Sequence, residues 1–563
     1  MPHLSPERAP TRTDAPAPPG GPARWWWSTP VLLSLLALWL LATLGLRPLL
    51  LPDEGRYAEV ARAMWTGSSW DAWLVPTLNG LPFFHKPPLF YWLDMAAMQL
   101  LGANVFAARF ASAFGAWLMG ASLWLAMRRG HGPRAAAIAL GVLATTPFFF
   151  IGGQYANHDM LVGGLITAAV LALARALEAP PRVDLRWLVT GWVLCGFAML
   201  AKGLIGFVLP ALVIGPWLLA QGRWRQTLRL LHPLAVFAFG VVAAPWFIAM
   251  QLRYPGFFDY FVMEQHFRRF AQSNFNNVHG LWFFLVVLPL LTLPWSAWLL
   301  AAAWRVAWPP ASARRVAWPP AAAWRVARPL AAAWRAWTGW RAEGDAGTSH
   351  AAPGNATLGL YAWWVIAVVG FFSLPSSKLV GYVLPALAPW CALLALAVGA
   401  PRANGGGRIW PWVMGASAIA CVAVVVAVAW KAPQSNRELA RTLAAGIAPG
   451  DKVVMVDEYL FDVPFYAQLK HPVVITGNWA DPELPKRDNW RKEMFDAARF
   501  DPALGRELLL PAGNLDRIAC GASAVWFIVP APNAAPVAAL AGALRAFSDA
   551  RNELWRVPGR ACP

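Results

Sequence analysis

Charged residues are scarce in this sequence. Only 13% of its 563 residues are Asp, Glu, Lys or Arg, whereas a typical soluble domain has about 25%. Hydrophobic residues make up 58% of the chain, and they occur in blocks. This composition excludes an ordinary soluble protein and indicates a membrane protein with several spans.

Cysteine is also scarce. Three of the five cysteines, Cys195, Cys391 and Cys421, lie in apolar runs, so the sequence contains no disulfide framework. Cys520 and Cys562 lie in the polar tail, where a disulfide and two free thiols both remain open. No Walker motif is visible, so we expect no nucleotide cofactor.

The apolar blocks have the length of membrane-spanning helices, which need roughly 20 residues. Eleven charge-free runs predict a mainly α-helical, polytopic bundle of about 11–13 helices. These runs are Trp25–Leu46, Phe110–Met127, Ala135–Ala156, Met160–Ala174, Trp187–Ala201, Leu204–Ala220, Pro233–Met250, Gly280–Trp304, Ala356–Ser377, Leu379–Ala400 and Ile409–Trp430.

The net charge of +18 comes from arginines that gather in every second loop. These basic segments lie at residues 8–24, 128–134, 175–186, 223–229, 305–341 and 402–408. Basic loops of membrane proteins stay in the cytoplasm. The pattern therefore predicts a cytoplasmic N-terminus and an external tail after Trp430, and it argues against nucleic acid as a partner.

The chain divides into three predicted parts. Residues 1–24 are expected to be a disordered cytoplasmic arm, and residues 25–430 a transmembrane domain with external loops at 51–104 and 251–279. Residues 431–563 predict a small external α/β domain, with strands at 452–456, 472–476 and 525–530 and helices at 436–445 and 535–547. We expect the helices of the 51–104 loop to lie along the outer membrane interface.

A decapeptide repeat occupies residues 301–340 and overlaps the basic insert at 305–350, which we expect to be cytoplasmic. Paired prolines punctuate it, so it cannot form one continuous helix. Two interpretations are open: a basic, Trp-rich strip on the anionic inner leaflet, or an expanded low-complexity loop without a role.

Ionisable residues gather on the external side of the predicted bundle. Asp53 and Glu54 follow the first helix, and His158–Asp159, Lys202 and Lys378 lie in short external turns. Ionisable groups at the membrane tend to be functional, although an acidic pair at a helix end can be merely interfacial. The convergence predicts a site for a charged ligand.

The residue types at this site suggest two kinds of chemistry. Cations can donate charge-assisted hydrogen bonds to a phosphate, and the candidates are Lys86, Lys202, Arg268, Arg269 and Lys378. Histidine and carboxylate together suit either a divalent metal ion or acid–base work, but no H-E-x-x-H spacing is present.

The stretch PDEGRYAEVARAMWTGSSWDAWLVPTLNGLPFFHKPPLFYW resembles the first external loop of the lipid A aminoarabinose transferases. These enzymes belong with the protein O-mannosyltransferases in the C-type glycosyltransferase superfamily. The segments QYANHDM, LAKG, EQHFRRF and SSKLVGYVLPALAP also match, as does the tail run YLFDVPFYAQLKHPVVI. The resemblance covers nearly the whole chain after residue 25, apart from the insert at 301–350.

The resemblance implies an enzyme that uses a polyprenyl-phosphate sugar as donor at the outer face. It implies that Asp53 is the central catalytic carboxylate and Asp159 a further acid near the site, and we place Glu54 with them. Lys86 and Arg269 are implied to hold the lipid phosphate, and we group Arg56, Lys202 and Lys378 with these cations. It also implies a divalent metal between His85 and His266, for which we favour zinc, although His85 stands where the family has Glu.

We therefore expect a glycosyltransferase of a bacterial inner membrane, with its C-terminal domain in the periplasm. The sugar is expected to be aminoarabinose or a related aminosugar or hexose, and the acceptor a lipid A phosphate or another lipopolysaccharide group. A protein O-mannosyltransferase or other cell-wall glycosyltransferase is the alternative. A polyprenyl-lipid flippase, which should carry polar groups near the membrane midplane, and a catalytically inactive lipid-binding scaffold are the alternatives from other classes.

Overall fold

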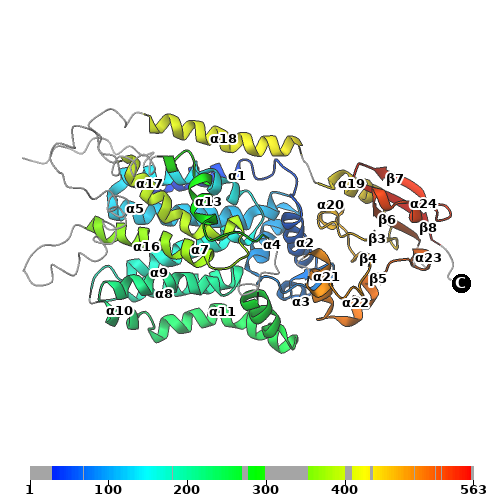
Figure 1. Cartoon of the computed structure of the whole chain (residues 1–563), viewed down its shortest axis with the longest axis horizontal. Coiled ribbons are helices and arrows are strands. Elements are labelled where there is room, and N and C mark those ends of the chain that lie inside the picture. The colour runs from blue at the N-terminus through cyan, green and yellow to red at the C-terminus, as the bar shows by residue number, and fades with distance from the viewer. Residues whose placement is uncertain are drawn as a thin grey trace, which may run out of the picture.

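The structure is a computed structural model that describes residues 28–67, 69–180, 182–268, 277–297, 353–399, 409–431, 435–486, 489–513, 515–520 and 523–559. Its helices form an elongated bundle, and a small domain with a β-sheet lies at one end of that bundle (Figure 1). The predicted N-terminal arm and the repeat at 301–340 lie outside the described residues.

Helices occupy all eleven predicted apolar runs, so the helical fold is confirmed. Among the described residues, five helices are long and apolar enough to cross a membrane: α5 (Phe110–Ala144, with the turn Ala107–Arg109 before it), α7 (His158–Ala176), α8 (Leu185–Lys202), α11 (Pro233–Arg253) and α18 (Trp410–Lys431). The other runs contain α1 (Thr29–Leu41), α6 (Pro147–Gly153), α9 (Ile205–Ala220), α13 (Phe283–Leu291), α16 (Pro353–Ser373) and η6 (Val380–Ala386) with α17 (Leu387–Gly399). Short α10 (Trp224–Arg229) joins α9 to α11.

Helix α5 contains two of the predicted runs, which meet at a kink. Gly132 has a φ of +84° there, and Pro133 follows it. Proline has no N–H for the helix ladder, and glycine accepts the positive φ, so the two residues together break the helix. The break falls in the predicted basic turn at residues 128–134.

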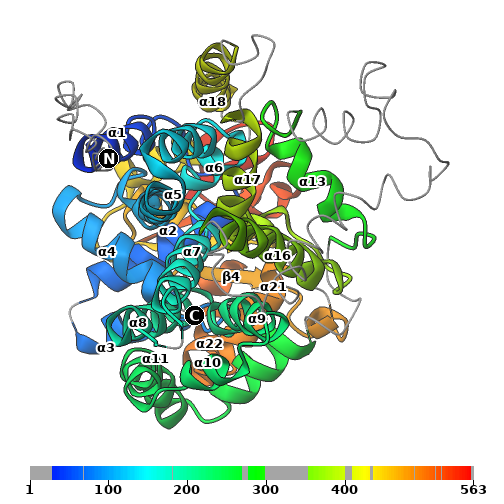
Figure 2. The same cartoon turned by 90° about the vertical axis from the view of Figure 1, so that its left-hand side faces the viewer.

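Helix α7 lies at the centre of the bundle (Figure 2) and approaches α5 very closely. A Cβ atom on Gly164 would lie 2.1 Å from the Gly115 carbonyl oxygen, and one on Gly115 would lie 2.4 Å from the Leu161 Cα. Glycine on both helices therefore permits backbone contact, as small residues do in membrane bundles. This packing fixes the N-terminal end of α7, which carries His158 and Asp159.

The segment at residues 51–104, predicted to be an external loop, folds into α2 (Asp53–Thr66), α3 (Trp70–Leu74), a two-stranded hairpin of β1 (Thr77–Leu78) and β2 (Leu81–Pro82), and α4 (Leu89–Leu101). Helix α2 is mostly buried, and it lies between the bundle and the C-terminal domain (Figure 1). The position of these helices relative to the membrane interface stays a prediction, but the buried side chains of α2 are covered by protein. Its small residues, such as Ala58 and Ala61, pack into protein.

The C-terminal domain is built on a six-stranded sheet with the order β5-β4-β3-β6-β8-β7. Strands β3 (Lys452–Val456), β4 (Val474–Gly477), β5 (Leu509–Pro511) and β6 (Ala524–Pro530) are parallel, and β8 (Asn552–Pro558) is antiparallel to both β6 and β7 (Leu544–Ser548). The flanking helices are α19 (Arg437–Gly446), α20 (Val463–Ala467), α21 (Trp490–Ala498), α22 (Pro502–Leu508), α23 (Leu515–Ile518) and α24 (Ala535–Ala538). The three predicted strands and the first predicted helix are present.

The predicted helix at 535–547 is wrong beyond Ala538. The chain there turns into β7, which pairs with β8 at the sheet edge. The alanine-rich sequence favours a helix locally, but hydrogen bonding to a neighbouring strand outweighs that preference. Cys520 forms a disulfide, while Cys195, Cys391 and Cys421 are free and Cys562 lies outside the described residues.

Candidate functional site

The half-exposed carboxylate of the site belongs to Asp53, the first residue of α2. Its side chain is 35% exposed, and its Oδ1 lies 3.2 Å from the Nη2 of Arg56. Residues three apart on a helix lie on the same face, so this spacing places the two charged groups next to each other. The structure thus gives Asp53 access to a ligand and a cation at its side.

The guanidinium of Arg56 bridges the first loop and the C-terminal domain. Its Nη1 donates to Glu493 Oε1 of α21 at 2.6 Å, and the group packs over the rings of Phe461 and Tyr57 at 5.0 and 5.6 Å. Burial opposes the charge of Arg56, but Glu493 and Asp53 raise its pKa above the ordinary value. Arg56 is therefore a permanent cation at the site.

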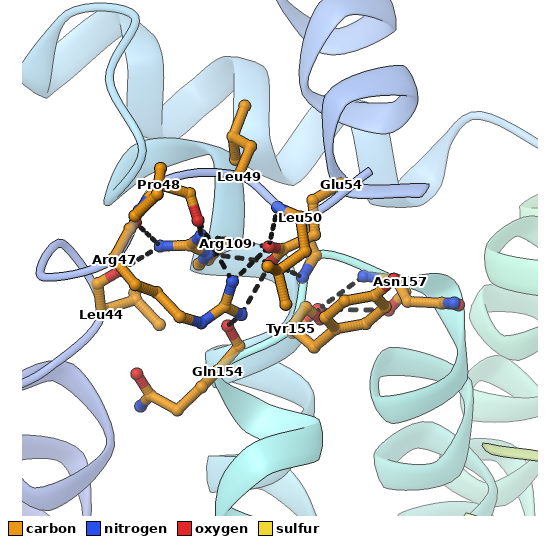
Figure 3. A network of polar contacts seen from close by, with 12 residues as sticks. Leu44, Arg47, Pro48, Leu49, Leu50, Glu54, Arg109, Gln154, Tyr155 and Asn157 are labelled. Carbon is orange, nitrogen blue, oxygen red and sulfur yellow. Dashed lines mark hydrogen bonds and ion pairs between the residues drawn. The ribbon is translucent and has the colours of Figure 1, made fainter. Parts of the chain in front are cut away.

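Glu54, the next residue, lies in a buried polar network (Figure 3). Its two oxygens accept hydrogen bonds from both guanidinium groups of Arg47 and Arg109, with distances of 3.0 Å for Arg47 Nη2 and 2.9 Å for Arg109 Nε. The backbone N–H groups of Leu50 and Ala156 also donate to it, each at 2.8 Å.

This network defines the role of Glu54. Burial opposes ionisation, yet the two arginines lower the pKa of Glu54 to about 2. A carboxylate with this many donors has no lone pair left for a substrate. We therefore assign it to holding the chain before α2 in place, in contrast to the catalytic role expected from the sequence.

Asp159 and Lys202 form an ion pair between the ends of α7 and α8. The Lys202 ammonium lies 5.0 Å from the ring centre of Tyr382 in η6. Asp159 packs directly on the backbone of Gly381, where an added Cβ would lie 2.2 Å from its Oδ2. Both predicted residues thus lie at neighbouring ends of two bundle helices, and each partly offsets the other's charge.

His158 is enclosed by aromatic rings next to this pair. Its ring is stacked on Phe90 at 4.4 Å and contacts Tyr57 and Tyr91 edge-on at 4.6 and 5.1 Å. Three cations lie close enough to interact with it electrostatically, namely Lys86, Lys202 and Arg56. His158 therefore marks the point around which the predicted cations of three different segments converge.

Lys378 does not join this group as a phosphate ligand. Its side chain is buried, and its Nζ donates to the backbone carbonyl of His279 at 2.8 Å and to that of Pro375. These bonds tie the loop after α16 to residues 277–279, which also pair with residues 376–378 through backbone hydrogen bonds. We therefore assign Lys378 to loop structure, contrary to the expectation.

The residues expected to bind a metal are only partly visible. His85 stacks on Phe83 at 4.6 Å and lies 5.9 Å from the ring of Tyr260. The side chain of His266, and Arg269 with it, lie outside the described residues. Among the side chains that are described, no three His, Cys, Asp or Glu residues gather as a metal site. The zinc site stays a prediction.

Glu493 was not anticipated from the sequence, because it lies in a helix of the tail that matches no motif. Arg109 was missed as well, although a lone arginine at the start of an apolar run is a usable signal for a buried partner. Tyr382 had a weaker signal, its place inside the matched segment SSKLVGYVLPALAP.

The arrangement combines a ligand-accessible carboxylate with several fixed cations. Arg56, Lys86 and Lys202 supply donors for an anionic group such as a phosphate. Asp53 can orient a reacting group or accept a proton beside them. The site is therefore suited to a reaction in which phosphate departs as an anion.

Comparisons with known proteins match a mannosyltransferase family and a set of arabinosyl transferases. A family model described as dolichyl-phosphate-mannose-protein mannosyltransferase matches residues 85–249. An undecaprenyl phosphate-alpha-4-amino-4-deoxy-L-arabinose arabinosyl transferase of Erwinia tasmaniensis is 32% identical over 64% of this chain and 57% of its own length. One of the same name from Aeromonas salmonicida is 32% identical over 72% of this chain and 66% of its own. The chain thus spans less than two thirds of these relatives.

A solved structure shows the same fold over nearly all of the chain. The crystal structure of ArnT from Cupriavidus metallidurans bound to undecaprenyl phosphate matches with a TM-score of 0.73 and 21% identity. The match covers 96% of this chain and all of the other. The bundle and the C-terminal sheet domain are therefore both part of a known architecture.

Proposed function

We propose that this chain, a member of the membrane glycosyltransferase family that includes the undecaprenyl-phosphate aminoarabinose transferases, moves a sugar from a polyprenyl-phosphate donor to lipid A. The sugar is aminoarabinose or a related aminosugar, and the acceptor is a lipid A phosphate or another lipopolysaccharide group. The observation that carries the proposal is the half-exposed Asp53 beside Arg56. Arg56, Lys86 and Lys202 all interact electrostatically with His158.

The reaction needs no activated nucleotide, because the donor carries its own leaving group. An acceptor oxygen forms a bond to the anomeric carbon, and the bond from that carbon to the donor phosphate oxygen breaks. Polyprenyl phosphate leaves with the bonding electron pair. Lys86 and Arg56 stabilise the charge that grows on that phosphate, and Asp53 orients the acceptor or the sugar.

The same proposal places the protein in a bacterial inner membrane. The arginine-rich segments between the helices support a cytoplasmic N-terminus and a periplasmic C-terminal domain. The site then opens toward the periplasm, because α2 and the end of α7 lie at the end of the bundle that carries the C-terminal domain (Figure 1).

The test compares lipid A from Gram-negative membranes with and without this protein by mass spectrometry. We expect a mass increase on lipid A that corresponds to one pentosamine or related sugar per modified phosphate. The Asp53→Asn variant, expressed to the same level, serves as the matched control and should give unmodified lipid A. Unmodified lipid A with the wild-type protein, in cells that make the donor, would contradict the proposal.

Protein glycosylation is the second candidate, because the family model that matches residues 85–249 is described as a protein mannosyltransferase. The same membranes distinguish it, since a new glycan would appear on a protein and not on lipid A. A flippase would move labelled donor across vesicles without forming any glycosylated product.

We further propose that the enzyme binds a divalent ion through His266, with His85 as a weaker ligand. Imidazole ligands favour zinc over magnesium. Elemental analysis of purified protein should show about one zinc per chain. A His85→Ala, His266→Ala double variant should lose it, and equal metal content in both proteins would contradict the assignment.

A further inference from the structure

The hairpin of β1 and β2 carries the chain to Lys86, and its tip is buried in the C-terminal domain. Asn79 at the tip donates from Nδ2 to the Val473 carbonyl at 2.9 Å, and its Oδ1 accepts from the Val473 N–H at 2.8 Å. The side-chain amide thus pairs with the backbone just before β4 as a neighbouring strand would. This satisfies both groups, which would otherwise be buried without partners.

Gly80 explains how the tip can approach so closely. Its φ is +79°, and an added Cβ would lie 2.8 Å from the Cγ of Pro472. Any other residue would be strained by the conformation and blocked by the neighbouring chain. Asn79 also has a positive φ of 53°, as the two-residue turn of such a hairpin requires.

The segment between the tip and Lys86 contacts the same domain at two places. Leu81 packs with Ala497 of α21 and Leu508 of α22 in a small apolar cluster. Phe84 then contacts the ring of Phe500, which follows α21, at 4.9 Å. Phe84 also contacts the rings of Tyr254 and Phe257 at 5.0 and 5.1 Å. Only His85 separates Phe84 from Lys86, so the C-terminal domain is one of two parts that hold the backbone from which Lys86 extends.

Helix α21 of the C-terminal domain also contacts Arg56, the second proposed phosphate-binding cation of the first loop. Glu493 of α21 holds the Arg56 guanidinium at 2.6 Å, as described above. Lys492 beside it pairs with Glu264 at 2.8 Å and with Asp496 at 2.6 Å, which ties α21 to residues 259–268. Helix α21 therefore contacts both external loops that carry predicted site residues.

We propose that Asn79 and Glu493 are positioning residues through which the C-terminal domain sets the two phosphate-binding cations, Asn79 for Lys86 and Glu493 for Arg56. The C-terminal domain then contributes to donor binding by positioning these two cations. This inference rests on the proposed function, because it concerns binding of the donor phosphate. It assigns a role to the Asn-Gly turn, which the transfer chemistry itself does not use.

The test measures binding of polyprenyl phosphate to the full-length protein in detergent by native mass spectrometry. Asn79→Ala should weaken binding about tenfold, because losing a buried hydrogen-bonded pair is worth about one factor of ten. In a Lys86→Ala background, Asn79→Ala should weaken binding by less than about twofold, because the effects of coupled residues are not additive. Glu493→Gln should likewise weaken binding in the wild-type protein, and it should weaken binding much less in an Arg56→Gln background.

Trp526→Phe is the matched control. It removes one part-buried hydrogen bond, from Trp526 Nε1 to Asp451 at 3.0 Å, within the same domain but away from the hairpin. It should lower thermal stability and leave binding unchanged. Equal losses from Asn79→Ala with and without Lys86, or unchanged binding for both Asn79→Ala and Glu493→Gln, would overturn the inference. A wild-type protein that fails to bind polyprenyl phosphate would instead contradict the proposed function.

Discussion

Asp53 and Glu54 are adjacent in the sequence but have opposite environments. A helix rotates by about 100° per residue, so neighbouring side chains point to different sides. Asp53 faces Arg56 and the ligand side, whereas Glu54 faces the arginines of the bundle. The sequence predicted an acidic pair at the site, but it could not distinguish these roles, because the partners of Glu54 lie 7 and 55 residues away.

We expect Glu54→Gln to destabilise the protein strongly at neutral pH. Removing one partner of a buried charge network costs about 3–5 kcal/mol, because the arginines are left uncompensated. The pKa of Glu54 is lowered from 4.5 to about 2 on folding, so its charge stabilises the fold above pH 4.5. That contribution is lost as the pH falls through about 2.

Thermal unfolding of both proteins in detergent, followed as a function of pH, measures this contribution. The difference between wild type and variant should be largest at pH 7 and shrink below pH 4.5. Glu438→Gln is a suitable control, because Glu438 forms only an exposed pair with Arg441 and should change little. A difference that is independent of pH would show that the charge of Glu54 is not what stabilises the fold.

Asp53→Asn should abolish transfer and leave the protein folded. The change removes the charge but keeps the shape, and the half-exposed side chain has little to stabilise. Transfer to lipid A and the thermal unfolding temperature measure the two effects separately. Turnover within about tenfold of wild type would show that Asp53 is not the catalytic carboxylate, since a tenfold change corresponds to only about 1.4 kcal/mol of barrier.

At the scale of elements, periodicity and composition were sufficient for the helices and for the central strands. The helices of the bundle could be predicted because each apolar run lacks charged residues and is flanked by charged ones. Strands β3 and β6 were readable because they are buried in the sheet. Strand β7 was not predicted, because four of its five residues are exposed and it is held at the sheet edge mainly by pairing with β8.

The placement of α2 could not be read from the sequence either. Its apolar residues indicate an amphipathic helix, but they do not show whether lipid or protein covers them. The C-terminal domain that covers it follows more than 370 residues later in the chain. For the same reason the contacts of Asn79 and Arg56 with that domain were invisible, since pairing between distant segments leaves no local pattern.

The repeat at residues 301–340 gives a prediction at this scale. Replacing it with a short polar linker should leave transfer activity within about twofold of wild type, because a proline-punctuated repeat contributes little packing. In the proposed topology it also lies on the opposite side of the membrane from Asp53. Activity lost from a protein that still inserts and unfolds at the wild-type temperature would show that the repeat has a function.

At the scale of the whole molecule, the fold brings together a lipid-facing bundle and a domain that closes over one end of it (Figure 1). A polyprenyl chain requires apolar surface, and its phosphate requires fixed cations. Arg56 lies at the junction of the two parts, where α2, the hairpin and α21 meet. In the proposed function the acceptor also reaches this junction, and its chemistry decides what Asp53 has to do.

The acceptor can be identified from the pH dependence of transfer. A phosphate monoester has its second pKa near 6, so a lipid A phosphate is already largely ionised at neutral pH and needs no strong base. Transfer to it should lose rate as the pH falls through about 6, following the ionisation of the acceptor. A hydroxyl acceptor must instead lose a proton to Asp53, and the rate would follow an enzyme carboxylate, which ordinarily titrates near 4. We expect the first profile, because the matches of the first loop are to the lipid A branch of the family.

The measurement is the initial rate of transfer as a function of pH, with purified enzyme, saturating donor and lipid A, and with Asp53→Glu as the comparison. A midpoint that moves with this substitution would assign the titration to the enzyme and would contradict the phosphate acceptor, whereas an unchanged midpoint near 6 would assign it to lipid A.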